Sequence, residues 1–143
     1  MPGNFSHVIK GFLASPYFNG LGESTIDHWK RELVLAEVTL GHLDVSEVRP
    51  SIIQAHLDGL AQYPGKQSTA KTALKAVEKW AIVRDFLPHP ITLGTQTIGS
   101  DGGHEPWTDQ EVADAIEHAR PDLARAVLLA VSTGQRGSDI VKM

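Results

Sequence analysis

The 143-residue chain contains no cysteine, and aromatic residues make up only 6% of it. The absence of cysteine excludes disulfides and thiolate metal sites, and it suits a reducing compartment. No stretch approaches the roughly 20 consecutive apolar residues that a membrane-spanning helix needs. The first residues also lack a basic segment followed by an unbroken apolar one, which argues against a secretory signal. We therefore expect a soluble, cytoplasmic protein with no membrane partner.

Positive charge is scarce as well, since the formal net charge is −4. Residues 1–100 hold 9 Lys and Arg against 9 Asp and Glu, whereas residues 101–143 hold 4 against 8. This balance excludes a uniformly basic coat of the kind that binds nucleic acid over the whole surface. Any surface that binds anions must therefore be a local patch.

Proline and glycine are concentrated between residues 88 and 106, where they prevent a regular helix from persisting. The sequence thus predicts a first domain over residues 1–87, a linker over residues 88–106 and a second unit over residues 107–143. No stretch alternates β-branched and polar residues for long enough to predict a strand. The expected fold class is all-α.

Four helices are predicted before the linker and two or three after it, from apolar periodicity and from capping residues. The first four are expected over about residues 5–14, 25–40, 50–60 and 69–85, with Ser24 capping the second and Ser68 the fourth. After the linker, Thr108 and Glu111 have the spacing of a capping box. The next helix, over about residues 122–132, is apolar enough to be buried nearly all round.

The fourth predicted helix separates basic from apolar side chains. A 100° spacing places Lys71, Lys75 and Lys79 on the face opposite its apolar residues, so we expect this face to be free. Like charges one turn apart repel by roughly a few tenths of a kcal/mol, and a polyanion would relieve that repulsion. The alternative is a face that is merely solvated. The seven histidines are scattered without metal-ligand spacing, so no metal site is expected.

The stretch AVSTGQRGSDIVKM, residues 130–143, holds Arg136 in a tight setting of small and polar residues. Gly134 can end a helix with a positive φ, which places Arg136 at the turn before the next helix. A guanidinium at a stiff corner can hold two phosphate oxygens at once. On local grounds Arg136 can equally well pair with Asp139 and brace the turn.

These residues resemble the first catalytic-arginine box of the tyrosine recombinases, or phage-type integrases, approximately A-x-x-T-G-x-R-x-x-[D/E]-[I/L]-x-x-[L/M]. Its seven defined positions are filled by Ala130, Thr133, Gly134, Arg136, Asp139, Ile140 and Met143. The stretch STAKTALKAVEKWA, residues 68–81, resembles the last helix of that family's N-terminal core-binding domain, with matches at Thr69, Lys71, Leu74, Lys79 and Trp80. STIDHWKREL resembles its second helix, and PWTDQEV resembles the start of its catalytic domain.

The resemblance implies a SAM-like, four-helix core-binding bundle that grips double-stranded DNA from one side. It also implies strand cleavage by a nucleophilic tyrosine without metal or cofactor. Arg136 matches an arginine that stabilises the charge of the scissile phosphate, and Asp139 matches an acidic residue that supports it. The residues expected to bind DNA are Lys66, Thr69, Lys71, Lys75 and Lys79 on the fourth helix, with Lys30 and Arg31 on the second.

The family's later catalytic elements, a hairpin lysine, a His-x-x-Arg box and the tyrosine, follow the first box and are not found in these 143 residues. We therefore expect this sequence to bind DNA but not to cleave it alone. The residues after the linker are near the lower size limit for an independent fold. We expect them to pack on the bundle, to form a homo-oligomer through exposed helices, or to stay mobile. The alternative function is a helical protein-interaction or dimerisation module without DNA binding.

Overall fold

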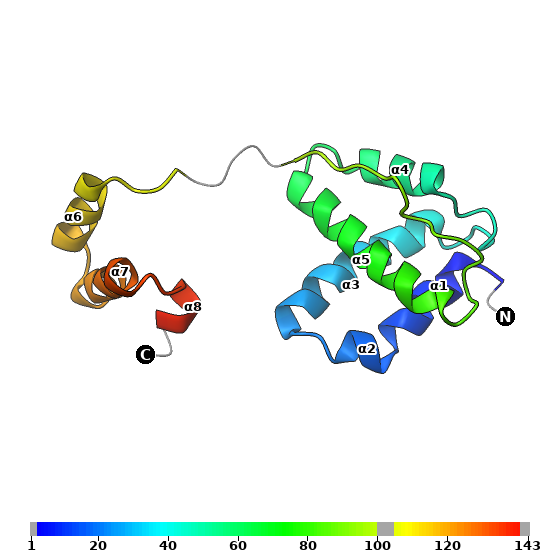
Figure 1. Cartoon of the computed structure of the whole chain (residues 1–143), viewed down its shortest axis with the longest axis horizontal. Coiled ribbons are helices and arrows are strands. Elements are labelled where there is room, and N and C mark those ends of the chain that lie inside the picture. Colours follow the sequence, from blue (N-terminus) through cyan, green and yellow to red (C-terminus); the bar gives the residue numbers. More distant parts are fainter. Residues whose placement is uncertain (1–2, 100–104, 141–143) are drawn as a thin grey trace. The chain divides into compact units, whose positions relative to one another are not determined.

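The computed structural model describes residues 3–99 and 105–140, apart from the side chains of Ser138 and Asp139. Within these residues the chain forms eight helices and no strand, so the expected all-α class is confirmed (Figure 1). The chain divides into two compact units, Met1–Asp101 and Gly102–Met143. The helices are α1 (Phe5–Leu13), α2 (Pro16–Asn19), α3 (Glu23–Leu40), α4 (Pro50–Asp58), α5 (Pro64–Ile82), α6 (Asp109–His118), α7 (Pro121–Thr133) and α8 (Gly137–Ile140).

The first unit is a bundle in which α3 and α5 pack against each other and α1 packs against both. The apolar faces predicted from periodicity meet in one core. Burial of this apolar area is the main favourable contribution to folding. The fully buried side chains of this core include Phe5, Val8, Ile9, Leu33, Ile53, Leu57, Leu74 and Val77.

Two helix starts differ from the sequence prediction. α5 begins at Pro64, so Ser68 lies inside the helix and does not cap it. Proline is favoured at the first helical position because its φ is already helical and its missing N–H has no partner there in any case. α3 begins at Glu23, and its N-cap is Gly22 instead of the predicted Ser24. The start of α4 at Pro50 is confirmed.

The bundle also holds a helix that the sequence analysis does not predict. α2 is a single turn with Pro16 at its first position, and the Ser15 hydroxyl accepts a hydrogen bond from the Phe18 amide at 3.3 Å. Five helices therefore precede the proline-rich region, where four are expected. A single turn is too short to show the apolar periodicity on which the prediction rests.

Residues 87–99, here called the strap, run along α4 and α5 (Figure 1). The Glu78 carboxylate accepts hydrogen bonds from the Ile91 amide (2.7 Å), the Thr92 amide (2.6 Å) and the Thr92 hydroxyl (2.8 Å). The Gln67 carboxamide oxygen accepts another from the Ile98 amide at 2.7 Å. Ile91 is completely buried. Much of the region expected to be a linker thus lies against the bundle.

The second unit contains α6, α7 and α8. Its capping box is confirmed, because the Glu111 amide donates to the Thr108 hydroxyl (3.3 Å) and the Thr108 amide donates to the Glu111 carboxylate (2.7 Å). Gly134 ends α7 with a φ of 64°, as the sequence predicts. The described residues contain no helix of the length and apolarity that a membrane span requires.

The prediction that the helix over about residues 122–132 is buried is wrong. None of the residues of α7 is buried, and Leu128 and Val131 are 53% and 60% exposed. The reason is the small size of this unit, since among its described helices only α6 and the four-residue α8 pack against α7.

Candidate nucleic-acid interface

The groove between α3 and α5 contains a hollow of about 460 Å³, here called the basic hollow. Residues 28, 31, 32 and 35 fall on one side of α3 because a helix repeats every 3.6 residues. The first turns of α5 form the opposite wall. The basic hollow is lined by His28, Arg31, Glu32, Leu35, Gly65, Lys66 and Thr69. Three of the residues predicted to bind DNA therefore meet at this point.

The basic hollow adjoins the N-terminus of α5. The N-cap residue is Tyr63, and no side chain of the described residues accepts a hydrogen bond from the first turn. Amides in a first turn lack acceptors within the helix and lie at the positive end of its dipole. Gly65 belongs to this turn and lines the hollow without a side chain to block it. Backbone N–H groups and side-chain cations can thus act on the same anion.

The cations of the basic hollow are available to a ligand. Arg31 and Lys66 are exposed, and neither forms a salt bridge with any described carboxylate. The Lys66 ammonium lies 5.3 Å from the centroid of the Tyr63 ring. Thr69 is half-buried and its hydroxyl donates to the Gly65 carbonyl oxygen at 2.9 Å. Two exposed cations thus lie beside the first turn of α5.

Glu32 reduces the positive charge of the basic hollow. Its side chain is 8% exposed, and its Oε2 atom is buried without a hydrogen-bond partner among the described residues. Apart from His28, the wall carries two cations and one carboxylate. We therefore expect an anion to bind here with modest affinity.

Other predicted residues lie beside the basic hollow or further along α5. Lys30 lines an adjoining hollow of about 420 Å³ with Arg31. Lys75 and Lys79 are both exposed. Lys79 also lines a separate pocket in which Trp29 and Ala76 show that α3 and α5 again face each other. These cations extend the charged surface away from the basic hollow.

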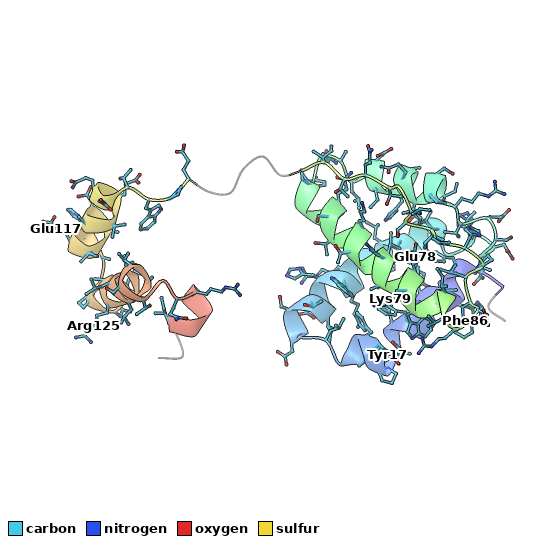
Figure 2. The ribbon with its side chains drawn as sticks, viewed as in Figure 1. Tyr17, Glu78, Lys79, Phe86, Glu117 and Arg125 are labelled. Atoms are coloured by element: carbon cyan, nitrogen blue, oxygen red, sulfur yellow. The ribbon has the colours of Figure 1, made fainter. Side chains whose placement is uncertain are left out.

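Lys71 does not lie on a free face. It is half-buried, and its ammonium donates a hydrogen bond to the Thr95 carbonyl oxygen of the strap at 2.6 Å. Glu78 precedes Lys79 on α5 (Figure 2), and like Lys71 it is hydrogen-bonded to the strap, through its carboxylate. The face that carries Lys71 and Glu78 is thus covered, whereas Lys75 and Lys79 remain exposed.

Sequence reasoning missed Glu32, His28 and Gly65 as parts of the basic hollow. The sequence pattern could have identified Glu32, because it lies on the buried side of α3 with Leu33 and Ala36. A carboxylate at such a position is rarely buried without a partner. No sequence pattern could have identified Gly65, because its role depends on the start of α5 at Pro64.

Arg136 is exposed and lies in the turn between α7 and α8, as the sequence predicts. Asp139 belongs to α8, but its side chain is outside the described part of the chain, as is all of Met143. Neither the phosphate role of Arg136 nor its pairing with Asp139 is tested by this geometry. Within residues 3–99 and 105–140, no group of three His, Asp or Glu side chains could hold a metal ion.

The resemblance to tyrosine recombinases rests mainly on two of the four sequence motifs. The arginine box at residues 130–143 ends beyond the described residues, and the motif at residues 68–81 forms most of α5. No family model matches the chain, and searches of curated proteins and of solved structures found no match either.

Proposed function

We propose that the first unit binds double-stranded DNA through the groove between α3 and α5, as the core-binding domain of a tyrosine recombinase. One observation carries the proposal: Arg31, Lys66 and Thr69 converge on the open N-terminus of α5. Cations that neutralise phosphates release counterions, and the first turn of a helix offers N–H donors to the phosphate oxygens. The basic hollow is therefore the proposed seat of one backbone phosphate.

The exposed cations on either side allow further phosphate contacts. Lys66 and Lys79 are thirteen residues apart on α5, which corresponds to about 20 Å along the helix axis. One DNA strand advances about 3.4 Å per phosphate, so this length matches roughly six nucleotides. Lys30, Lys75 and Lys79 are the proposed flanking contacts. Lys71 is assigned to the strap, because its ammonium is already hydrogen-bonded there.

The proposal concerns DNA binding and includes no cleavage step. The chain has two tyrosines, and each packs its ring against a cationic side chain. Tyr17 lies under the guanidinium of Arg84, and Tyr63 is the N-cap residue of α5 beside Lys66. Neither is placed as a nucleophile beside a general base. The resemblance assigns Arg136 and Asp139 to phosphate binding and its support, and this assignment remains part of the proposal.

The test compares two double variants that change the net charge equally. Arg31→Glu with Lys66→Glu is expected to weaken binding of a short DNA duplex by about tenfold or more, because both cations that hold the phosphate of the basic hollow are replaced by carboxylates that repel it. The control is Arg49→Glu with Arg125→Glu. Both arginines are exposed; Arg49 directly precedes α4, and Arg125 lies on α7. This control is expected to change the affinity by no more than about twofold. Equal losses in both variants, measured by fluorescence anisotropy, would contradict the proposed site.

A second function is supported by α7. Its exposed leucine and valine side chains form an apolar surface on a helix with no buried residue. Exposed apolar surface of this kind is typical of interaction sites. We therefore also propose that the second unit associates with a second copy of the chain.

A further inference from the structure

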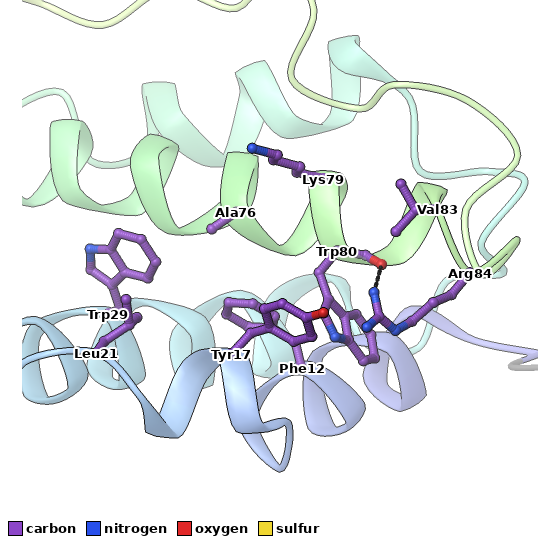
Figure 3. Close-up of a pocket in the computed structure, with 9 residues that line it drawn as sticks. All are labelled: Phe12, Tyr17, Leu21, Trp29, Ala76, Lys79, Trp80, Val83 and Arg84. Carbon is purple, nitrogen blue, oxygen red and sulfur yellow. Dashed lines mark hydrogen bonds between the residues drawn. The ribbon is translucent and has the colours of Figure 1, made fainter.

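The first unit has a second hollow, of about 450 Å³, here called the aromatic pocket (Figure 3). Its wall includes Phe12 of α1, Tyr17 of α2, Trp29 of α3 and Trp80 of α5. Four aromatic rings from four helices thus surround one space. Such a volume lies within the range of about 300–1,000 Å³ that is common for small-molecule sites.

The wall of the aromatic pocket is braced from behind. The Trp80 ring meets Phe12 edge-on, with 5.9 Å between centroids, and packs against Phe86 at 5.6 Å. A Cβ at Gly11 would lie 3.0 Å from the Trp80 ring, so the glycine permits this close approach. The indole is therefore held in place before any ligand arrives, which reduces the ordering cost of binding.

Two cations lie at the aromatic pocket. The Arg84 guanidinium carbon is 4.8 Å from the Trp80 ring centroid and 5.1 Å from the Tyr17 ring centroid, and one N–H donates to the Trp80 carbonyl oxygen at 2.9 Å. Its other N–H donors remain for a ligand. Neither Arg84 nor Lys79 forms a salt bridge with a carboxylate of the described residues.

The Trp80 indole supplies one more polar group without a partner. Its Nε1 atom is buried and has no hydrogen-bond acceptor among the described side chains and backbone. Tyr17, by contrast, is 66% exposed and can turn away at little cost in buried area. The pocket therefore combines apolar walls with donors and positive charge, and no described residue of its lining is a carboxylate.

We propose that the aromatic pocket binds a small aromatic carboxylate. The aromatic body of the ligand packs between Trp29 and Trp80, where ring–ring contacts add to the burial of apolar area. Its carboxylate accepts charge-assisted hydrogen bonds from Arg84 and Lys79. This inference does not rest on DNA binding, because the basic hollow shares no residue with the aromatic pocket and Lys79 is the one proposed DNA contact that also lines it.

The test uses 2-naphthoate as the probe and the full chain labelled with ¹⁵N. The three tryptophans give three indole N–H signals, two from the aromatic pocket and one from Trp107, which is 62% exposed in the second unit. The Trp29 and Trp80 signals are expected to shift and saturate as 2-naphthoate is added, while the Trp107 signal stays in place. The neutral analogue 2-naphthalenemethanol is expected to bind about tenfold more weakly, because it lacks the charge.

Variants then separate charge from apolar contact. Lys79→Gln and Arg84→Gln are each expected to weaken 2-naphthoate binding by about fivefold to tenfold and to leave the alcohol nearly unaffected. The matched control, Arg49→Gln, removes an exposed cation at the residue before α4 and is expected to leave 2-naphthoate binding unchanged. If Arg84→Gln fails to fold, Lys79→Gln decides, since its side chain is exposed. Equal binding of acid and alcohol, or equal shifts of all three indole signals, would overturn the proposal.

Discussion

His56 is a half-buried imidazole on α4 with one hydrogen-bonded nitrogen. Its Nδ1 lies 3.1 Å from the Thr39 hydroxyl oxygen, whereas its Nε2 is buried without a partner among the described residues. Burial lowers the pKa of His56 below its usual value of 6.5, because the protonated form loses hydration. A positive charge at this position therefore opposes folding.

The pH dependence follows from the sign of this shift. Below pH 6.5 the unfolded chain binds a proton at His56 that the folded chain does not bind, so stability falls as the pH drops toward the folded pKa. Above pH 6.5 both states are neutral at His56, and its contribution stays constant. His56→Gln is expected to lose less stability than the wild type between pH 7.5 and pH 5.5 in urea unfolding. Parallel pH profiles for the two proteins would contradict this assignment.

Carboxylates act in a different range of pH. Hydrogen bonds from Ser6 and Lys10 lower the pKa of Glu37 below its usual 4.5, and hydrogen bonds from Ser46 lower that of Asp44 below 3.8. Their contributions are present above the unfolded values and are lost in more acidic solution. Between pH 7.5 and 5.5 the change in stability therefore reports the titration of histidine and not that of these carboxylates.

Single residues were predictable where their structure depends on near neighbours. The capping box of Thr108 and Glu111 and the positive φ of Gly134 each involve residues no more than four positions apart. Lys71 differs, because its ammonium binds the carbonyl oxygen of Thr95, 24 positions further along the chain. The apolar periodicity of a helix cannot predict a contact between residues so far apart in the sequence.

At the scale of elements, the strap shows why composition alone did not predict packing. Pro88 and Pro90 prevent a helix, and the sequence analysis inferred a linker from this. Ile91 is nevertheless fully buried, and Gln54 and Gln96 exchange two hydrogen bonds, of 2.7 and 3.1 Å. Irregular backbone packs well when half-buried side chains such as Glu78 satisfy its N–H groups.

The basic hollow was predictable only in part. The resemblance to the recombinase helices gave Arg31, Lys66 and Thr69 separately, but it did not bring them together. Their meeting depends on how α3 and α5 cross and on the start of α5 at Pro64. Both are properties of tertiary packing, which a helix pattern read along one element does not contain.

The exposed apolar residues of α7 are the proposed contact between two copies of the chain. Leu128→Glu with Val131→Glu is expected to shift the chain toward monomer in sedimentation velocity, because charged side chains replace two exposed apolar ones. The control is Val38→Glu with Leu93→Glu, which changes two apolar residues that are 75% and 72% exposed in the first unit. We expect the control to sediment like the wild type. A wild-type chain that is monomeric at every concentration, or a control that dissociates equally, would contradict an interface on α7.

At the scale of the whole molecule, charge is distributed unevenly. Residues 1–100 carry equal numbers of acidic and basic side chains, and residues 101–143 carry 4 Lys and Arg against 8 Asp and Glu. Net charge therefore does not favour DNA, and a salt-dependent affinity has to come from the cations grouped along α3 and α5. This makes the salt dependence of binding a direct report on that surface.

The most direct test is a titration of a short DNA duplex with the full chain across a series from 50 to 200 mM salt. The logarithm of the affinity is expected to fall linearly with the logarithm of the salt concentration, with a slope of roughly −3 to −4 for four phosphate contacts. Arg31→Glu with Lys66→Glu is expected to make the slope shallower by about 1, because the phosphate contact at the basic hollow is lost. No binding at 50 mM salt, or an affinity that salt does not change, would contradict the proposed function.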